Sequence, residues 1–224
     1  MSLGIQDIIH SLEFFSNLNE DEMKQLISIS SLKSYGSECL LHYEKSQSTK
    51  LLFLVSGLAK AYKIDKHDNE IFLYYIYKNN IISEISSLQN KHLTTYSSIT
   101  FVEDSQVLSV DYAEFKEKFL DNGVLCLELA SEVIKQSKLL QDLINREFIF
   151  DSVSKVAMML SSDLDMFNKL KRYDVSLMLH IQPSTLSRVL SRLKRNTLID
   201  IDHGKVIIRD KKGLEKIYEG LEYE

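Results

Sequence analysis

Positions 174–190, which read DVSLMLHIQPSTLSRVL, place the narrowest limit on how this chain can fold. Ser176 supplies a small side chain where two helices can cross, and Pro183 suits the first position of a helix, where its missing N–H costs nothing. His180 stands at a turn position that favours glycine, at some cost in stability. The apolar residues have the spacing with which two short helices pack across a tight turn: Val175, Leu179, Ile181, Leu186 and Val189. The segment predicts a helix-turn-helix with its turn at residues 180–182.

The second helix of this motif carries hydroxyls and positively charged groups on its outward side. Such groups hydrogen-bond to phosphates and base edges, and an arginine can form two bonds to one guanine. We therefore predict that this helix binds DNA. The predicted contact residues are Gln182, Ser184, Thr185, Ser187, Arg188, Arg192, Lys194 and Arg195.

A short ribbon follows the motif. Residues 198–201 read LIDI and residues 206–209 read VIIR. The turn between them contains Gly204, which can adopt a positive φ. The pattern predicts a wing beside the recognition helix.

The charge of the chain is distributed unevenly. The net charge is −5, yet residues 168–196 contain seven Lys or Arg and a single acidic residue, Asp174. All six arginines lie at position 146 or later. A charge run alone is more often a solvated helix face, but next to a helix-turn-helix it indicates a nucleic-acid module attached to an acidic domain.

The remaining composition excludes several classes of protein. The longest run of aliphatic and aromatic residues, LLFLV at 51–55, is far shorter than the roughly 20 residues that span a bilayer. The start of the chain has no basic segment followed by an apolar one, so we expect no secretion signal. Cys39 and Cys126 make no disulfide framework, which suits a reducing compartment. We expect a cytoplasmic protein without a membrane partner.

The first half of the chain predicts helices followed by a set of strands. Asn19 with Glu22 three residues later is typical of a helix N-terminus within residues 5–35. Residues 50–64 alternate around Gly57, residues 70–77 are rich in β-branched and aromatic residues, and residues 66–69 suit a turn between them. Residues 97–103 and 105–110 are expected to form another pair. The fold class predicted is α+β, with an antiparallel β-roll (a double-stranded β-helix) as sensor domain.

Residues 121–150 predict one long helix, since they lack proline and their only glycine, Gly123, lies near the start. A heptad seam runs along it: Cys126, Leu129, Val133, Gln136, Leu140, Leu143, Glu147 and Phe150. We predict a homodimer through Leu129, Val133, Gln136, Leu140 and Leu143. The alternative is a helix that packs on its own domain. The expected domains are 1–120 (sensor), 121–150 (dimerisation helix) and 151–224 (winged helix-turn-helix).

In this order of parts, the chain resembles the Crp/Fnr family of bacterial transcription regulators over nearly its full length. The resemblance rests on LLFLVSGLAKAYKI (51–64), IISEISSL (81–88), KVAMMLSSD (155–163), DVSLMLHIQPSTLSRVLSRLKRNTLI (174–199) and HGKVII (203–208). It implies a homodimer whose roll senses a signal, a long helix that transmits the signal, and bound dimers that recruit or block RNA polymerase. In the familiar pattern a Glu stands at the position of Ser184 and binds cytosine, while an Arg at the position of Arg188 binds guanine on an inverted-repeat site.

The resemblance also suggests where a ligand would bind. The cyclic-nucleotide branch of the family has a phosphate cassette with a Glu for the ribose and an Arg for the phosphate. This chain retains Glu84 but has only Lys91, Thr94 and Thr95 near the Arg position. Because no Arg precedes position 146, a two-bond clamp on phosphate is impossible in the roll, and cAMP or cGMP is disfavoured. The residues that would line a ligand pocket here are Glu84, Lys91, Thr94 and Thr95, and the alternative for Glu84 is a structural role in a turn.

Two other sensing groups occur in the family. An iron–sulfur cluster needs four cysteine ligands, and this chain has two, so we expect none. Haem, which would sense NO or another gas, stays open with His10 and His42 as candidate axial ligands, and a small non-nucleotide ligand is the other possibility. We expect no catalytic residues and no metal site.

Two alternatives to a regulator are a cupin-like enzyme and a cyclic-nucleotide-binding module. A cupin needs an HxH metal motif, which is absent from the sequence. The phosphate-binding and nucleophile motifs of common enzymes are absent as well. A cyclic-nucleotide module would have no use for the predicted wing.

Overall fold

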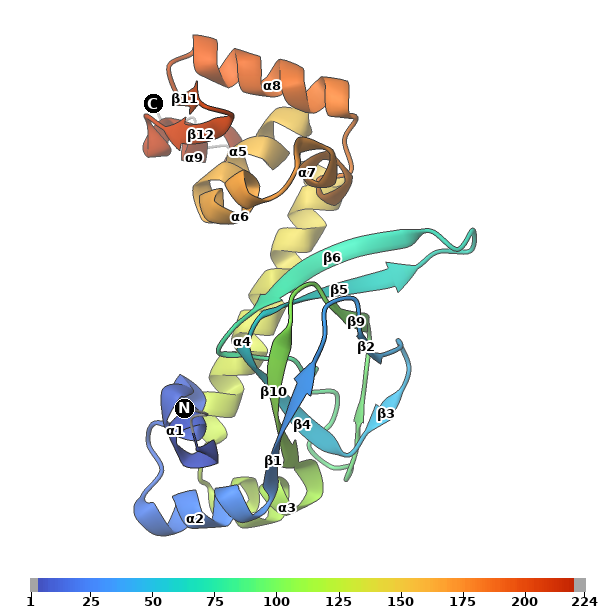
Figure 1. Cartoon of the computed structure of the whole chain (residues 1–224), viewed down its shortest axis with the longest axis vertical. Coiled ribbons are helices and arrows are strands. Elements are labelled where there is room, and N and C mark those ends of the chain that lie inside the picture. Colours follow the sequence, from blue (N-terminus) through green and yellow to red (C-terminus); the bar gives the residue numbers. More distant parts are fainter. Residues whose placement is uncertain (1–3, 220–224) are drawn as a thin grey trace. The chain divides into compact units, whose positions relative to one another are not determined.

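The computed structural model describes residues 4–219 and divides the chain into two compact units, residues 1–139 and 140–224. The division falls within the long helix α4 (Cys126–Ile144), so this helix contributes to both units. The predicted division into three domains stays a prediction. Figure 1 shows the elements of each unit in chain order.

Helices close one end of the first unit. They are α1 (Ile5–Ser11), η1 (Glu13–Phe15), α2 (Glu20–Ser28), α3 (Tyr112–Lys118) and η2 (Leu120–Asn122). The predicted start of α2 is confirmed: the Asn19 side chain accepts a hydrogen bond from the Glu22 N–H at 2.9 Å, and the Glu22 carboxylate accepts one from the Asn19 N–H at 2.9 Å. This reciprocal pair satisfies N–H groups that have no partner within the helix.

Two four-stranded antiparallel sheets form the predicted roll (Figure 1). The first has the order β1 (Ser30–Tyr35), β10 (Ser105–Asp111), β4 (Lys50–Ser56), β7 (Asn80–Ile81). The second has the order β2 (Leu40–His42), β9 (Ser98–Phe101), β5 (Leu58–Ile64), β6 (Glu70–Tyr77). A small ribbon joins β3 (Gln47–Ser48) to β8 (Leu93–Thr94). The predicted β5–β6 hairpin is present, with its turn at residues 65–69.

The expected pairing of residues 97–103 with 105–110 is wrong. β9 pairs with β2 and β5, whereas β10 pairs with β1 and β4 in the other sheet. The chain crosses between the two sheets at residues 102–104, as it also does at Gly57 between β4 and β5. The two crossings lie against each other: Gly57 has φ +92°, and a Cβ there would stand 2.6 Å from the carbonyl oxygen of Asp104.

The core of the first unit has two parts. One lies between the sheets and includes Leu54, Ile99 and Phe101. The other lies beneath the helices and includes Phe15, Phe53, Tyr112 and Leu129. Leu129 belongs to α4, so the first half of α4 is fixed to the roll by apolar packing.

The predicted helix over residues 121–150 is shorter than expected. Gly123 and Leu125 both have positive φ, and the regular helix begins at Cys126. After Ile144 the chain forms a π-helical turn, η3 (Asn145–Ile149), instead of continuing as an α-helix. A π-turn changes the phase of the helix, so a strict seven-residue seam cannot continue through it.

The second unit is the winged domain. It contains α5 (Ser152–Ser162), α6 (Leu164–Lys169), α7 (Arg172–Met178), α8 (Pro183–Arg195), the ribbon of β11 (Ile199–Asp202) with β12 (Lys205–Ile208), and α9 (Lys211–Glu219). Its core includes Val156, Phe167, Val175, Leu190 and Leu214. Among residues 4–219, no helix has the length and apolar character that a membrane crossing requires.

Candidate nucleic-acid interface

The helix-turn-helix forms as predicted from α7 and α8. Ser176 is fully buried at the crossing, where its hydroxyl donates to the Tyr173 carbonyl at 2.6 Å. His180 adopts φ +50°, the left-handed conformation expected at this turn, and its Nδ1 lies 2.7 Å from Oε2 of Glu147 on η3. The predicted packing residues Val175, Leu179, Leu186 and Val189 are buried, and Ile181 packs against them half-buried.

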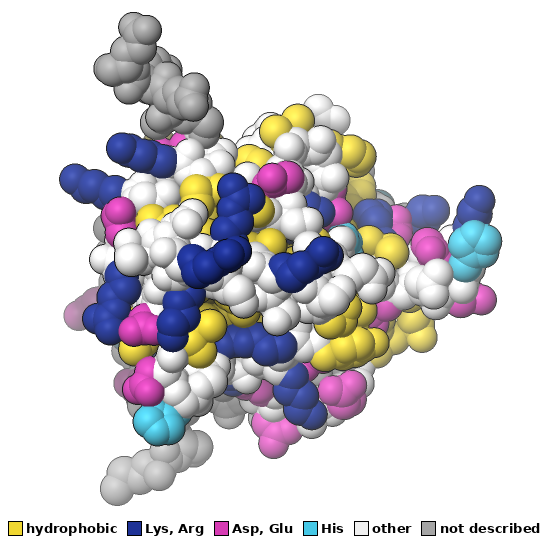
Figure 2. All heavy atoms as spheres, turned by 90° about the horizontal axis from the view of Figure 1, so that it is seen from above, with side chains coloured by type: hydrophobic (Ala, Val, Ile, Leu, Met, Phe, Trp, Pro, Cys, Tyr) yellow, Lys and Arg dark blue, Asp and Glu magenta, His cyan; other side chains and the backbone are white. Residues whose placement is uncertain are grey.

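The recognition helix α8 begins at Pro183 and has one apolar and one polar side. Arg188 is exposed, and its Nη2 donates to the hydroxyl of half-buried Thr185 at 3.2 Å. Figure 2, which views this unit from the side of α8, shows Lys and Arg side chains spread over the face, with uncharged surface and a few Asp and Glu side chains between them. The other predicted contact residues are exposed as well: Gln182, Ser184, Ser187, Arg192, Lys194 and Arg195.

One predicted contact residue, Lys194, forms an ion pair with the wing. The Lys194 ammonium lies 2.9 Å from Oδ1 of Asp200 on β11, and Arg209 Nη2 lies 3.2 Å from Oδ2 of the same carboxylate. Lys194, the Ile201 N–H and Arg209 hold the pKa of Asp200 well below its ordinary value. The carboxylate therefore remains ionised at neutral pH and offsets positive charge at the end of α8.

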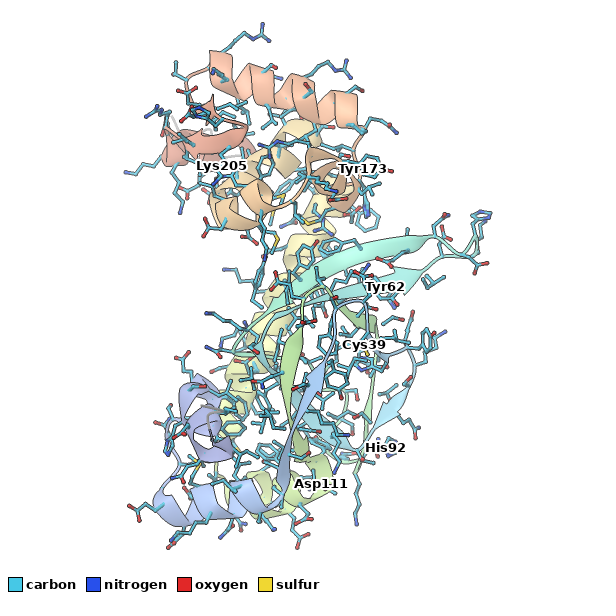
Figure 3. The ribbon with its side chains drawn as sticks, viewed as in Figure 1. Cys39, Tyr62, His92, Asp111, Tyr173 and Lys205 are labelled. Atoms are coloured by element: carbon cyan, nitrogen blue, oxygen red, sulfur yellow. The ribbon has the colours of Figure 1, made fainter. Side chains whose placement is uncertain are left out.

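The wing is present where the sequence predicted it. Asp202 pairs with Lys205 in the β11–β12 ribbon, and Gly204 has φ +80° in the turn between the strands. His203 also has positive φ, and its Nδ1 lies 2.7 Å from Asp202. Lys205 is exposed on the wing (Figure 3).

The predicted dimer seam divides between two sides of α4. Leu129 is buried in the core of its own unit, and the Gln136 amide donates to the Ser83 carbonyl at 3.0 Å. Leu129 and Gln136 therefore pack against their own domain, which is the alternative that the sequence allowed. Leu143 is half-buried, whereas Val133 and Leu140 are exposed. Val133 and Leu140 belong to a different seam of exposed positions on α4, with spacing 4,3,4,3,4. Its residues are Cys126, Ala130, Val133, Ser137, Leu140 and Ile144.

The residues proposed for a ligand pocket mostly bind their own chain. The Glu84 carboxylate accepts hydrogen bonds from the Tyr96 N–H and from the Ser97 N–H and hydroxyl. Burial raises the pKa of Glu84, and these hydrogen bonds act against the rise. The Glu84 carboxylate therefore has hydrogen-bond partners within its own chain, and its part in ligand binding stays a prediction.

Of the two threonines of this region, Thr95 is bound to its own chain through its side chain and Thr94 through its backbone N–H. Buried Thr95 donates through its hydroxyl to the Tyr43 carbonyl at 2.9 Å and accepts from the Ser46 N–H at 3.0 Å. The Thr94 N–H donates to the Ser86 hydroxyl at 2.7 Å. Lys91 is exposed on the loop before them.

The candidate haem ligands lie on separate elements. His10 is exposed in the last turn of α1. His42 is half-buried on β2, where desolvation lowers its pKa from 6.5 to about 4. Its imidazole is therefore neutral at physiological pH. Within residues 4–219, no three His, Cys, Asp or Glu side chains gather in an arrangement that could hold a metal ion.

Comparison with known proteins supports the same reading of both units. A family model described as a Crp-like helix-turn-helix domain matches residues 155–217, and one described as a cyclic nucleotide-binding domain matches residues 32–122. A search of curated protein sequences gave no match.

Solved structures share the fold at low sequence identity. A CooA mutant from Carboxydothermus hydrogenoformans is 18% identical with a TM-score of 0.70, covering 92% of this chain and 95% of that chain. FixK2 from Bradyrhizobium japonicum is 14% identical with a TM-score of 0.68, covering 84% and 97%. A putative Crp/Fnr-family regulator from Eubacterium rectale is 17% identical with a TM-score of 0.64, covering 92% and 98%.

Proposed function

We propose, since this chain is a transcription regulator of the Crp/Fnr family, that two copies bind an inverted-repeat DNA site through α8 and the wing. The observation that carries this proposal is the outward side of α8, where short hydroxyls alternate with guanidinium groups above a buried apolar side. Such a surface can enter a major groove without leaving a buried charge unpaired. A homodimer of these motifs places its two helices about one helical turn of DNA apart, or on the order of 10–11 bp.

Recognition of the DNA sequence is assigned to Ser184 and Arg188 on α8. Arg188 can bind guanine O6 and N7 with two parallel hydrogen bonds. Ser184 lies one turn earlier on the same side, but its hydroxyl is too short to reach as a Glu would and has no charge that requires an amine donor. We expect one strongly specified G·C pair in each half-site and weaker discrimination at the neighbouring pair.

Dimerisation is assigned to the exposed seam of α4 defined above. Val133, Leu140 and Ile144 are 44%, 51% and 45% exposed, an apolar stripe that burial against a second copy would remove from water. Ala130 and Ser137 are small enough for two helices to approach closely at their level. A hollow of about 500 Å³ lies beside the stripe, between Val133 and Leu120, and can receive side chains of the partner.

The signal is proposed to be a ligand smaller than a cyclic nucleotide. A cavity of about 230 Å³ lies between β6 and α4, with Tyr74 and Ile82 on the roll side and Gln136 and Leu139 on the helix side. This volume is below the roughly 300–1,000 Å³ of sites for drug-sized ligands. A ligand held there would contact α4, the helix proposed for dimerisation, and could therefore act on the dimer directly. Contact of the bound dimer with RNA polymerase is proposed from family membership alone.

DNA binding can be tested with a fluorescent duplex of random sequence. Titration of the chain should show binding that weakens steeply as salt is raised, because cations released from phosphates drive it. Replacing Arg188 and Arg192 with Ala should abolish most of this binding. Replacing exposed Lys33 and Lys66 of the first unit with Ala removes the same charge and should leave it intact. Equal losses in both double variants would show that α8 is not the binding surface.

A further inference from the structure

Arg172 belongs to the basic stretch and stands at the start of α7, so charge alone would make it a phosphate contact. Its guanidinium instead points into its own domain. Nη2 donates to the Gly204 carbonyl at 2.7 Å, and Nη1 donates to the Phe167 carbonyl at 3.2 Å. The guanidinium carbon lies 4.5 Å from the centre of the Phe167 ring, and that ring is fully buried. Burial lowers the pKa of Arg172, in keeping with a group directed away from solvent.

The carbonyl that Arg172 holds is at the tip of the wing. Gly204 lies in the turn between β11 and β12, next to exposed Lys205. An isolated two-stranded ribbon has little stability of its own in water. This ribbon, with four residues in each strand, needs ties to the domain if Lys205 is to be held in one place.

A second tie lies further along the same strand. The Asn168 amide donates to the Val206 carbonyl at 2.9 Å, and its oxygen accepts from the Val206 N–H at 2.8 Å. Asn168 thereby occupies a backbone donor and a backbone acceptor of β12, as a neighbouring strand would. Arg172 and Asn168 together fix the tip and the second strand of the wing to α6 and α7.

We infer that Arg172 is a positioning residue of the wing, which acts on DNA binding through Lys205 and makes no phosphate contact of its own. This inference rests on the proposed function, in which the wing contacts DNA. An arginine is suited to the role because its planar group can bond two carbonyls and stack on a ring at the same time, whereas a lysine offers a point charge.

A double-mutant cycle separates the two roles of Arg172. DNA affinity is measured for the wild type, Arg172→Ala, Lys205→Ala and the double variant, with a duplex that the wild type binds. If Arg172 acts through the wing, Lys205→Ala weakens the wild type several-fold but has no further effect in Arg172→Ala. Additive losses, with a salt slope that falls by about one more charge for Arg172→Ala, would identify a separate phosphate contact and overturn the inference. An absence of any loss on Lys205→Ala in the wild type would also overturn it.

Two further variants serve as controls. Lys171→Ala removes the same charge from the exposed neighbouring residue, and its effect should add to that of Lys205→Ala. Thermal unfolding shows whether Arg172→Ala is folded. If it is not, Arg172→Lys, which keeps the charge, takes its place in the cycle. A positioning role predicts that Arg172→Lys also removes the effect of Lys205→Ala, and retention of that effect would contradict it.

The proposed function is monitored in the same experiment. Wild-type binding that Arg188→Ala weakens supports the proposed function whatever the cycle shows, so an additive cycle then overturns the role of Arg172 alone. A wild type that binds no duplex would overturn the proposed function and this inference with it.

Discussion

The ammonium nitrogen of Lys194, near the end of α8, lies 2.9 Å from a carboxylate oxygen of Asp200 on the first strand of the wing. Arg209 binds the other oxygen of the same carboxylate at 3.2 Å. One acidic side chain thus occupies two cations at the junction of recognition helix and wing. The charge that this domain offers to DNA is therefore lower than its count of lysines and arginines suggests.

Asp200→Asn should release both cations. We expect tighter binding to every DNA sequence, with a salt slope steeper by about one to two phosphate contacts, since Lys194 and Arg209 become free to bind phosphate. The measurement is a fluorescence titration at several salt concentrations. Asp165→Asn removes the same charge at an exposed position of α6 and is the control. An Asp200→Asn variant with unchanged affinity and slope would show that this pair does not restrain DNA binding.

Leu140→Glu should convert the dimer to a monomer, because it places a charge within the exposed seam of α4, where burial of an unpaired charge costs several kcal/mol. Sedimentation at micromolar concentration measures the outcome. Lys138→Glu changes charge on the same helix outside the seam and should leave the dimer intact. The seam is misassigned if Leu140→Glu still sediments as a dimer.

Cyclic nucleotides should not bind in the micromolar range. The roll has no Arg for the phosphate, and Glu84 already accepts hydrogen bonds from Ser97 and Tyr96. Calorimetric titration with cAMP and with cGMP tests this expectation. Micromolar binding of either would contradict it and would point to Lys91, Thr94 and Thr95 as the contacts.

His42 should make the protein less stable in mild acid. Its pKa in the folded chain is about 4, below the ordinary value of 6.5, so between these values only the unfolded chain binds the proton. Stability falls as pH decreases from about 6.5 to about 4 and does not depend on this group above that window. We expect a loss on the order of 2 kcal/mol, after allowance for screening at a partly accessible ring.

The measurement is urea unfolding of the wild type and His42→Leu across pH 4–7. The difference between the free energies of unfolding of the two proteins should change within this window and stay constant above it. His67→Leu removes an exposed histidine and should follow the wild type. Parallel pH profiles for the wild type and His42→Leu would contradict the assignment.

The sequence predicted the DNA-binding domain far better than the details of the roll. The elements of the winged motif are local, and each has its own signal in the chain, such as Pro183 at the start of α8 or Gly204 in the wing. The sequence carries no such signal for the strands with which β9 and β10 each pair. Strands that follow each other in a roll can lie in different sheets, and alternation of apolar residues does not show at which residue the chain crosses over.

The dimer seam shows a second limit of sequence patterns. Leu129 and Val133 both fit one heptad, but Leu129 packs into the roll and Val133 faces outward. A helix with two apolar sides gives the same spacing as a helix with one wide seam, and only the tertiary packing separates them.

Charge patterns fail in a similar way. Arg172 and Lys194 count as basic residues in the sequence, yet Arg172 is bound to the Gly204 carbonyl and Lys194 to the Asp200 carboxylate.

Selection of binding sites from random DNA tests the central claim most directly. The wild type should enrich an inverted repeat whose half-sites lie about 10–11 bp apart, with one strongly specified G·C pair and a weakly specified neighbour in each. Arg188→Ala should lose the preference at that pair, at a cost of roughly 1–3 kcal/mol, while it keeps the spacing of the repeat. Enrichment of no symmetric site by the wild type, or an unchanged G·C preference in Arg188→Ala, would contradict the proposed docking of α8.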